Sequence, residues 1–109
     1  MTVNELMEAC GLTAILLPDG EREVSGAYAG DLLSWVMGRA SEGNAFVTIM
    51  THLNVIAVAS LRDLSCVIFA EGVSVPQEVI DAAVQKEVNL LGSRLPAYET
   101  CAALSRCLP

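Results

Sequence analysis

Four polar side chains that could hold a ligand follow one another closely in the middle of the chain: Thr48, Thr51, His52 and Asn54. They stand where a predicted buried strand over residues 45–50 meets a predicted helix over residues 51–63. In open α/β sheets, ligands bind beyond the carboxyl end of a strand, where the next helix begins. Hydroxyls, a carboxamide and free helix N–H groups at this junction predict a pocket for a phosphate or carboxylate, and capping of the helix is the alternative role.

His52 is the only histidine of the chain and stands at the predicted start of that helix. The positive end of a helix favours the neutral imidazole, so this side chain could serve as a general base. Acid–base catalysis would also need an orienting carboxylate, or a nucleophile with a base, and no nearby residue has that spacing. We therefore predict no catalytic residue and favour a capping role for His52 over a ligand contact. A small enzyme that uses His52 as general base is an alternative function.

A second predicted loop, over residues 26–31, faces the same junction and contains Gly30 and Asp31. Its glycines would let the backbone approach a ligand closely, and we expect Gly30 or Asp31 to cap the helix that follows. The GxGxxG and GxxxxGKS motifs are absent, which disfavours nucleotide hydrolysis. Because Asp31 would repel a bare anion, a ligand that carries both hydroxyl and phosphate groups suits the site better.

A further carboxylate follows the predicted strand over residues 65–70, in the pair Glu71 and Gly72. It would lie at the same edge of the sheet as the polar cluster. A turn is the favoured interpretation of this pair, because glycine adopts the backbone conformation that a tight turn requires.

The four cysteines are scattered along the chain: Cys10, Cys66, Cys101 and Cys107. They form no CxxC pair and no Cys/His spacing typical of a metal site. We expect them to be small buried hydrophobic residues, and we predict no metal and no cofactor. A redox or iron–sulfur accessory protein that uses these cysteines is a further alternative.

Composition bounds the class of protein. A chain of 109 residues predicts one domain over residues 1–109, and its 53% hydrophobic but only 5% aromatic content predicts an aliphatic core with little surface for base stacking. The net charge of −7 disfavours nucleic acid and anionic membranes as partners. No apolar run approaches the ~20 residues of a spanning helix, and the start of the chain does not read as a signal peptide. We therefore expect a cytoplasmic location.

The elements that would position these residues alternate along the chain. Strands are predicted over residues 12–17, 23–27, 45–50, 65–70 and 89–92. Helices are predicted from a capping box of Thr2 with Glu5, from Asp31, from Thr51, from a capping box of Ser74 with Gln77, and from Pro96. This order predicts an α/β fold with a mostly parallel sheet of four to five strands flanked by helices.

An open sheet in a small aliphatic protein leaves edges and apolar surface, so we expect a homodimer. Trp35 lies on the apolar face of the helix predicted after Asp31. Core packing is its expected role, with a dimer contact as the alternative.

Three segments carry a resemblance to a known family: residues 26–40 (GAYAGDLLSWVMGRA), residues 43–72 (GNAFVTIMTHLNVIAVASLRDLSCVIFAEG) and residues 95–104 (LPAYETCAAL). They resemble the small stand-alone proteins of the DRTGG-domain family, which are similar to the N-terminal domain of HPr kinase and to a regulatory segment of some bacterial phosphotransacetylases. The Asp-Arg-Thr-Gly-Gly string that names the family does not occur in this chain. The resemblance implies an α/β fold like the N-terminal domain of HPr kinase.

The resemblance also implies a regulatory role beside an ATP-binding partner protein, without the kinase active site, which lies in a different domain of HPr kinase. Together with the polar cluster, it predicts a non-enzymatic regulatory or ligand-sensing module. Such a module would bind a small anionic or nucleotide-like ligand, or dock a partner protein. The predicted ligand-binding residues are Thr48, Thr51, His52, Asn54, Gly30 and Asp31.

Overall fold

The computed structural model describes residues 1–108 and contains five strands and five helices in that range. Their order is α1 (Val3–Cys10), β1 (Thr13–Leu16), β2 (Gly26–Ala29), α2 (Leu33–Arg39), β3 (Asn44–Thr48), α3 (Leu53–Leu61), β4 (Cys66–Phe69), α4 (Gln77–Lys86), β5 (Leu90–Gly92) and α5 (Ala97–Cys107). This order matches the predicted alternation of strands and helices.

The strands form one sheet in the order β1-β5-β4-β3-β2. Strands β2, β3, β4 and β5 are parallel, and only β1 at one edge runs antiparallel, to β5. The register of β3 and β4 pairs Phe46 with Val67. The predicted α/β fold with a mostly parallel sheet is therefore confirmed.

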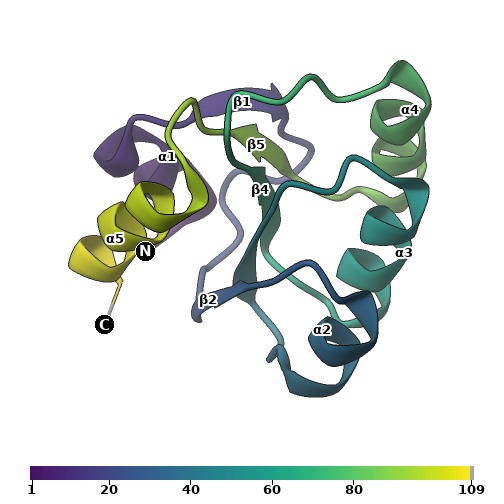
Figure 1. The fold of residues 1–109 in the computed structure, drawn as a ribbon, viewed down its shortest axis with the longest axis horizontal. Coiled ribbons are helices and arrows are strands. Elements are labelled where there is room, and N and C mark those ends of the chain that lie inside the picture. The colour runs from purple at the N-terminus through teal and green to yellow at the C-terminus, as the bar shows by residue number, and fades with distance from the viewer. Residues whose placement is uncertain (109) are drawn as a thin grey trace.

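Helices cover both faces of the sheet, with α1 and α5 on one side and α2, α3 and α4 on the other (Figure 1). Strand β3 is buried along its whole length because it lies between the two layers. Its side chains alternate, so that Phe46 packs toward α2–α4 while Ala45 and Val47 pack toward α1 and α5. A strand buried on both faces reads as a continuous apolar run, which is the pattern in the sequence.

Helix α1 begins with the predicted capping box. The Thr2 hydroxyl accepts a hydrogen bond from the Glu5 N–H at 3.2 Å, and the Glu5 carboxylate accepts one from the Thr2 N–H at 2.8 Å. Gly11 ends the helix with a φ of +65°, a conformation that glycine adopts without steric cost. The start of α1 is therefore confirmed as predicted from the capping box.

The second predicted capping box, of Ser74 with Gln77, is wrong. Pro76 is the N-cap of α4 and makes no side-chain capping bond. The Gln77 amide instead donates to the Asp81 carboxylate at 2.9 Å, one turn further along the helix. The extended backbone of Pro76 moves the start of the helix past Ser74, whose hydroxyl is then too early in the chain to cap it.

The predicted start of α2 is also wrong, because neither Gly30 nor Asp31 caps it. Leu32 occupies the N-cap position without a side-chain hydrogen bond. The preceding strand is displaced as well: extended pairing was expected over residues 23–27, whereas β2 pairs with β3 only from Gly26 onward. Glu23 forms an isolated bridge with Thr2 instead, which fixes the segment before β2 against the start of α1.

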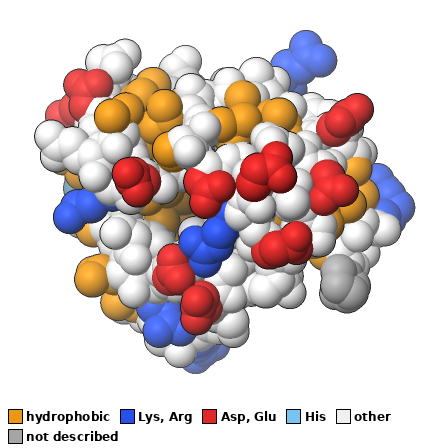
Figure 2. All heavy atoms as spheres, turned by 180° about the vertical axis from the view of Figure 1, so that it is seen from behind, with side chains coloured by type: hydrophobic (Ala, Val, Ile, Leu, Met, Phe, Trp, Pro, Cys, Tyr) orange, Lys and Arg blue, Asp and Glu red, His pale blue; other side chains and the backbone are white. Residues whose placement is uncertain are grey.

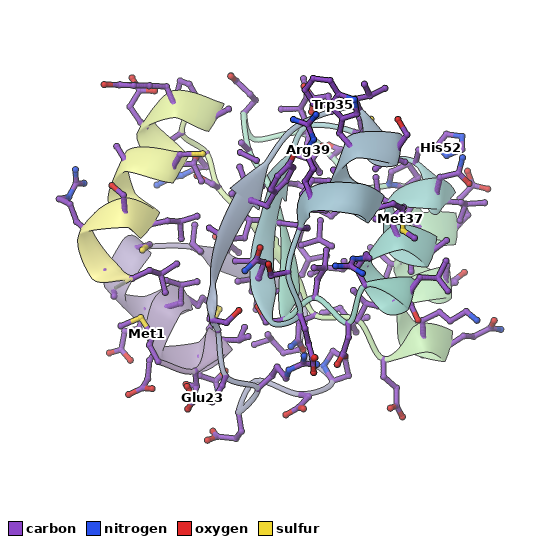
Figure 3. The ribbon with its side chains drawn as sticks, turned by 90° about the horizontal axis from the view of Figure 1, so that it is seen from below. Met1, Glu23, Trp35, Met37, Arg39 and His52 are labelled. Carbon is purple, nitrogen blue, oxygen red and sulfur yellow. The ribbon has the colours of Figure 1, made fainter. Side chains whose placement is uncertain are left out.

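Trp35 does not pack in the core, contrary to the expectation for it. Its side chain is 52% exposed on α2, and the Arg39 guanidinium lies 3.7 Å from the centre of its ring. Figure 3 shows the two side chains together at the surface. The helix turns Val36 inward instead, and Val36 is fully buried.

Acidic side chains outnumber basic ones in the chain, 13 to 6. Figure 2 shows Asp and Glu side chains across the face opposite to that of Figure 1, with basic side chains scattered among them. Between residues 1 and 108, no helix is both long and apolar enough to cross a bilayer.

Candidate functional site

A cavity of about 280 Å³ lies beyond the carboxyl ends of β2, β3 and β4. It is lined by Ala29, Gly30, Asp31, Val47, Thr48, Ile49, Glu71 and Ala97. The residues that follow three parallel strands therefore line one cavity, at the edge of the sheet where α/β proteins bind ligands.

Thr48 and Asp31 form the first wall of the cavity. Thr48 is the last residue of β3 and is almost fully buried, whereas Asp31 is exposed in the segment between β2 and α2. The Thr48 hydroxyl donates to the Asp31 carboxylate at 3.0 Å and accepts from the Met50 N–H at 3.2 Å. This pair of bonds fixes the hydroxyl, and the hydroxyl in turn orients the carboxylate at the mouth of the cavity.

Glu71 brings a second carboxylate to the cavity. Its φ of +66° lies in the left-handed region, which is unfavourable for a residue with a side chain, and Gly72 follows with a φ of +63°. The Glu71 N–H donates to the Leu95 carbonyl and the Gly72 N–H donates to the Ser93 carbonyl, each at 2.9 Å, and these two bonds hold the conformation.

Buried hydrogen bonds fix the segment between β5 and α5, which contacts Glu71. The hydroxyls of Ser93 and Thr100 are buried and lie 2.8 Å apart, and the Ser93 hydroxyl accepts from the Leu95 N–H at 3.2 Å. The first N–H of α5, at Ala97, donates to the Glu71 carboxylate at 3.4 Å. The start of α5 and the end of β4 are thereby fastened together on one side of the cavity.

The charged side chains that line the cavity are acidic. Its lining contains the carboxylates of Asp31 and Glu71 and no Lys, Arg or His from the part of the chain that the structure describes. Carboxylates accept hydrogen bonds from hydroxyl and amino groups, and they repel phosphates. The arrangement is therefore suited to a ligand group that donates hydrogen bonds.

The structure brings Gly30, Asp31 and Thr48 of the predicted site to this cavity, and it places Thr51, His52 and Asn54 outside its lining. His52 is the N-cap of α3, and its Nδ1 accepts from the Asn54 N–H at 3.1 Å. Figure 3 shows His52 at the outer surface, pointing into solvent. The capping role favoured for His52 is confirmed.

Helix α3 is also shorter than predicted. The predicted helix over residues 51–63 is observed as Leu53–Leu61, so Thr51 precedes the cap and takes no part in the first turn. The chain needs Ile49 to Thr51 to cross from β3 to α3. This crossing carries His52 and Asn54 away from the strand end where Thr48 stands.

Glu71 and Ala97 line the cavity but were not among the predicted ligand-binding residues, although Glu71 was correctly expected at this edge of the sheet, in a turn. Glu71 directly follows a buried strand in the sequence. Its position after a parallel strand is the feature that predicts it at this edge of the sheet. Ala97 has no chemistry of its own. Its N–H has no partner within the helix, because Pro96 is the N-cap of α5 and Ala97 is its first helical residue, and it donates to the Glu71 carboxylate instead.

The four cysteines are free thiols in different environments. Cys66 is buried in β4, as expected, and burial raises the pKa of its thiol to about 12. Cys10, Cys101 and Cys107 are only partly buried and lie on the side of α1 and α5. Among residues 1–108, no group of three or more His, Cys, Asp and Glu side chains is arranged to hold a metal ion.

A larger hollow of about 430 Å³ lies between β2 and α5. Its floor includes Ala27 and Ala29 of β2, and its wall includes Leu104 and Leu108 at the end of α5. Ala27 and Ala29 point to the same face of the sheet as Val47 of β3 but are exposed. The helical layer therefore leaves one apolar groove open beside the β2 edge.

No family model and no curated protein matches the chain. Among solved structures, it is similar to the CBS and DRTGG domains of the regulatory region of a pyrophosphatase from Clostridium perfringens, in complex with the activator diadenosine tetraphosphate. The sequence identity is 14%, and the TM-score is 0.74 with 99% of this chain covered. The fold is DRTGG-like. The DRTGG-like chain spans 47% of the length of that structure.

Proposed function

We propose that this DRTGG-like chain is a non-enzymatic ligand-sensing module whose cavity takes up the nucleoside part of a nucleotide. The observation that carries the proposal is the carboxylate of Asp31, oriented by the buried Thr48 hydroxyl, in one cavity with the carboxylate of Glu71. Two such acceptors bind ribose hydroxyls or an exocyclic amino group. The phosphate of the nucleotide would stay in solvent, because the lining offers it no cation within residues 1–108.

The size of the cavity sets the size of the ligand group. At about 280 Å³, it lies just below the range of pockets that hold drug-sized molecules. One nucleoside fits this volume, and two nucleosides joined by phosphates would leave the second one outside. The nucleotide activator of the similar pyrophosphatase region supports a nucleotide as the class of ligand.

Calorimetric titration with adenosine, AMP and diadenosine tetraphosphate tests the proposal. We expect the wild type to bind adenosine, and Asp31→Asn and Glu71→Gln each to weaken binding about 5-fold, because a hydrogen bond to a neutral amide oxygen contributes about 1 kcal/mol less than one to a carboxylate. Asp31→Asn keeps an oxygen that accepts from Thr48, so the fold should survive. His52→Ala is the matched control and should bind as the wild type does.

Two results would reject this function. Loss of binding in His52→Ala with full binding in Asp31→Asn would move the site to the start of α3. Absence of adenosine binding to a folded wild type would remove the nucleoside from the proposal altogether.

We also propose that the chain forms a homodimer through the outer edge of β2. Charged residues, proline and β-bulges protect edge strands from pairing with another chain. The strand from Gly26 to Ala29 has none of these features. The opposite edge strand, β1, has a shift of register between Ala14 and Leu16 and is followed by Pro18. A second copy can pair its own β2 with this edge across a twofold axis and cover the adjoining apolar groove.

Light scattering at micromolar concentration tests the dimer. We expect a mass of about 23 kDa, twice the 11.5 kDa of one chain. Ala29→Lys on β2 should return the protein to the monomer, and Ala14→Lys on β1 should leave the dimer intact. A monomeric wild type, or a dimer that Ala29→Lys does not affect, would contradict this interface.

A further inference from the structure

Two cysteines from opposite ends of the chain meet at the surface of the α1 and α5 layer. Cys10 is the last residue of α1 and Cys107 is the last residue of α5. Their Sγ atoms lie 3.6 Å apart, although the residues are separated by 97 positions in the sequence. In residues 1–108, this is the one contact between two thiols that the structure contains.

We infer that Cys10 and Cys107 form a reversible intramolecular disulfide that fastens the end of α5 to the end of α1. A disulfide needs its sulfurs at about 2.0 Å, so the two Sγ atoms must approach by about 1.6 Å. Both residues end their helices, and the last turns of helices fray readily. The approach therefore requires only a small movement of two helix ends.

The environment separates this pair from the other two cysteines. Cys66 is fully buried in β4, where no oxidant can reach its sulfur. Cys101 is partly buried on α5, like Cys107, but the described residues include no thiol in contact with it. Cys101 thus provides an internal comparison on the same helix.

The oxidant is a low-molecular-weight disulfide such as oxidised glutathione. A thiolate of the pair attacks one sulfur of the oxidant, the S–S bond of the oxidant breaks, and one glutathione thiolate leaves. The second cysteine then attacks the protein sulfur of this mixed disulfide and releases the second glutathione thiolate. The protons of the two cysteine thiols go to the two leaving thiolates, so the protein loses two electrons and two protons and the oxidant gains them.

The bond has a consequence for the apolar groove. Leu104 and Leu108 form part of its wall, and both lie within the last turns of α5 or directly after them. A cross-link at Cys107 ties this part of the wall to α1. Oxidation therefore holds one side of the groove in place, and reduction releases it.

Mass spectrometry on the intact native protein tests the inference. After equilibration with oxidised glutathione and quenching with an alkylating agent, we expect the protein to carry two fewer alkyl groups than the reduced protein treated in the same way, and digestion to give a peptide that joins Cys10 to Cys107. Cys101→Ser should still form the bond, and Cys10→Ser and Cys107→Ser should not. The oxidised wild type should melt more than about 5 °C above the reduced form, because the bond closes most of the chain into one loop.

The alternatives have distinct signatures. A bond to Cys101, a bond between two chains, or a protein that only accumulates mixed disulfides with glutathione would each overturn the inference. Differential alkylation of the wild type gives the same answer if a serine variant fails to fold, since it requires that Cys10 and Cys107 lose their reactivity together. Independent loss of reactivity at either residue would contradict the pairing.

Discussion

The buried hydroxyl of Thr48 donates a 3.0 Å hydrogen bond to the exposed carboxylate of Asp31, and this contact joins the end of β3 to the segment that follows β2. One oxygen thereby serves two purposes. It keeps the Met50 N–H paired just after the strand, and it directs the carboxylate at the cavity. Stability and ligand binding should therefore both depend on Thr48.

Replacement of Thr48 by valine, which has a similar shape, removes this oxygen. We expect Thr48→Val to lower the free energy of unfolding by about 1 kcal/mol, because the Met50 N–H loses its acceptor. Thr51→Val is the control and should change stability by less than about 0.5 kcal/mol, since Thr51 lies outside the cavity at a partly exposed position. Urea denaturation measures both, and equal effects at the two positions would contradict the role given to Thr48.

The left-handed backbone of Glu71 gives a second prediction. At a φ of +66°, Glu71→Gly should be more stable than Glu71→Ala by about 1 kcal/mol, because alanine retains the Cβ that makes this conformation unfavourable. At Glu78, in the first turn of α4, the order should reverse and alanine should be the more stable. Both Glu71 variants should lose affinity for adenosine. Alanine more stable than glycine at position 71 would rule out the strained conformation.

Alkaline pH should destabilise the protein through Cys66. Burial raises the pKa of its thiol from 9.0 to about 12, so the folded state keeps the proton longer than the unfolded state does. This contribution to stability is complete below pH 9 and is lost as the pH rises toward 12, by at most about 1.4 kcal/mol per pH unit. Urea denaturation under reducing conditions at pH 8 and pH 10 should show a smaller pH-dependent loss in Cys66→Ala than in the wild type. Equal losses in both proteins would be evidence against a buried thiol.

Salt should distinguish the nucleoside from the phosphate of a ligand. The carboxylates of Asp31 and Glu71 and the net charge of −7 repel a phosphate that stands outside the cavity, and salt screens this repulsion. When the salt concentration rises from 50 to 500 mM in a calorimetric titration, the affinity for AMP should increase several-fold while that for adenosine stays nearly constant. A loss of AMP affinity with salt would instead indicate a cationic phosphate site.

Much of the fold was predictable from the sequence, because the local patterns of capping residues and apolar runs match the helix starts and buried strands of the structure. Buried strands appear as apolar runs, and the capping box of Thr2 with Glu5 places the start of α1 correctly. The start of α4 was predicted wrongly because the pattern Ser74 to Gln77 fits a capping box as well, and only the extended backbone of Pro76 excludes it. Thr2 to Glu5 and Ser74 to Gln77 have the same pattern, but only the first caps a helix. In the second, Pro76 lies inside the pattern and is itself the N-cap.

The site was predictable only in part, for a geometric reason. Thr48 and His52 are four positions apart in the sequence, but one ends a strand and the other begins a helix across a short connection that turns His52 outward. Glu71 is far from Thr48 in the sequence but comes to the same cavity, because β3 and β4 are neighbours in the sheet. Closeness in the sequence grouped Thr48 with Thr51, His52 and Asn54, whereas the order of the strands brings Glu71 to the cavity beside Thr48 and leaves those three residues outside its lining.

Amide chemical shifts in a titration with adenosine test the central claim most directly. We predict that the largest changes lie at the amides of Gly30, Thr48 and Glu71, which line the cavity, and that Asp31→Asn reduces them. Changes centred on His52 and Asn54, or an unchanged spectrum at saturating adenosine, would contradict a nucleoside site at the carboxyl ends of β2, β3 and β4.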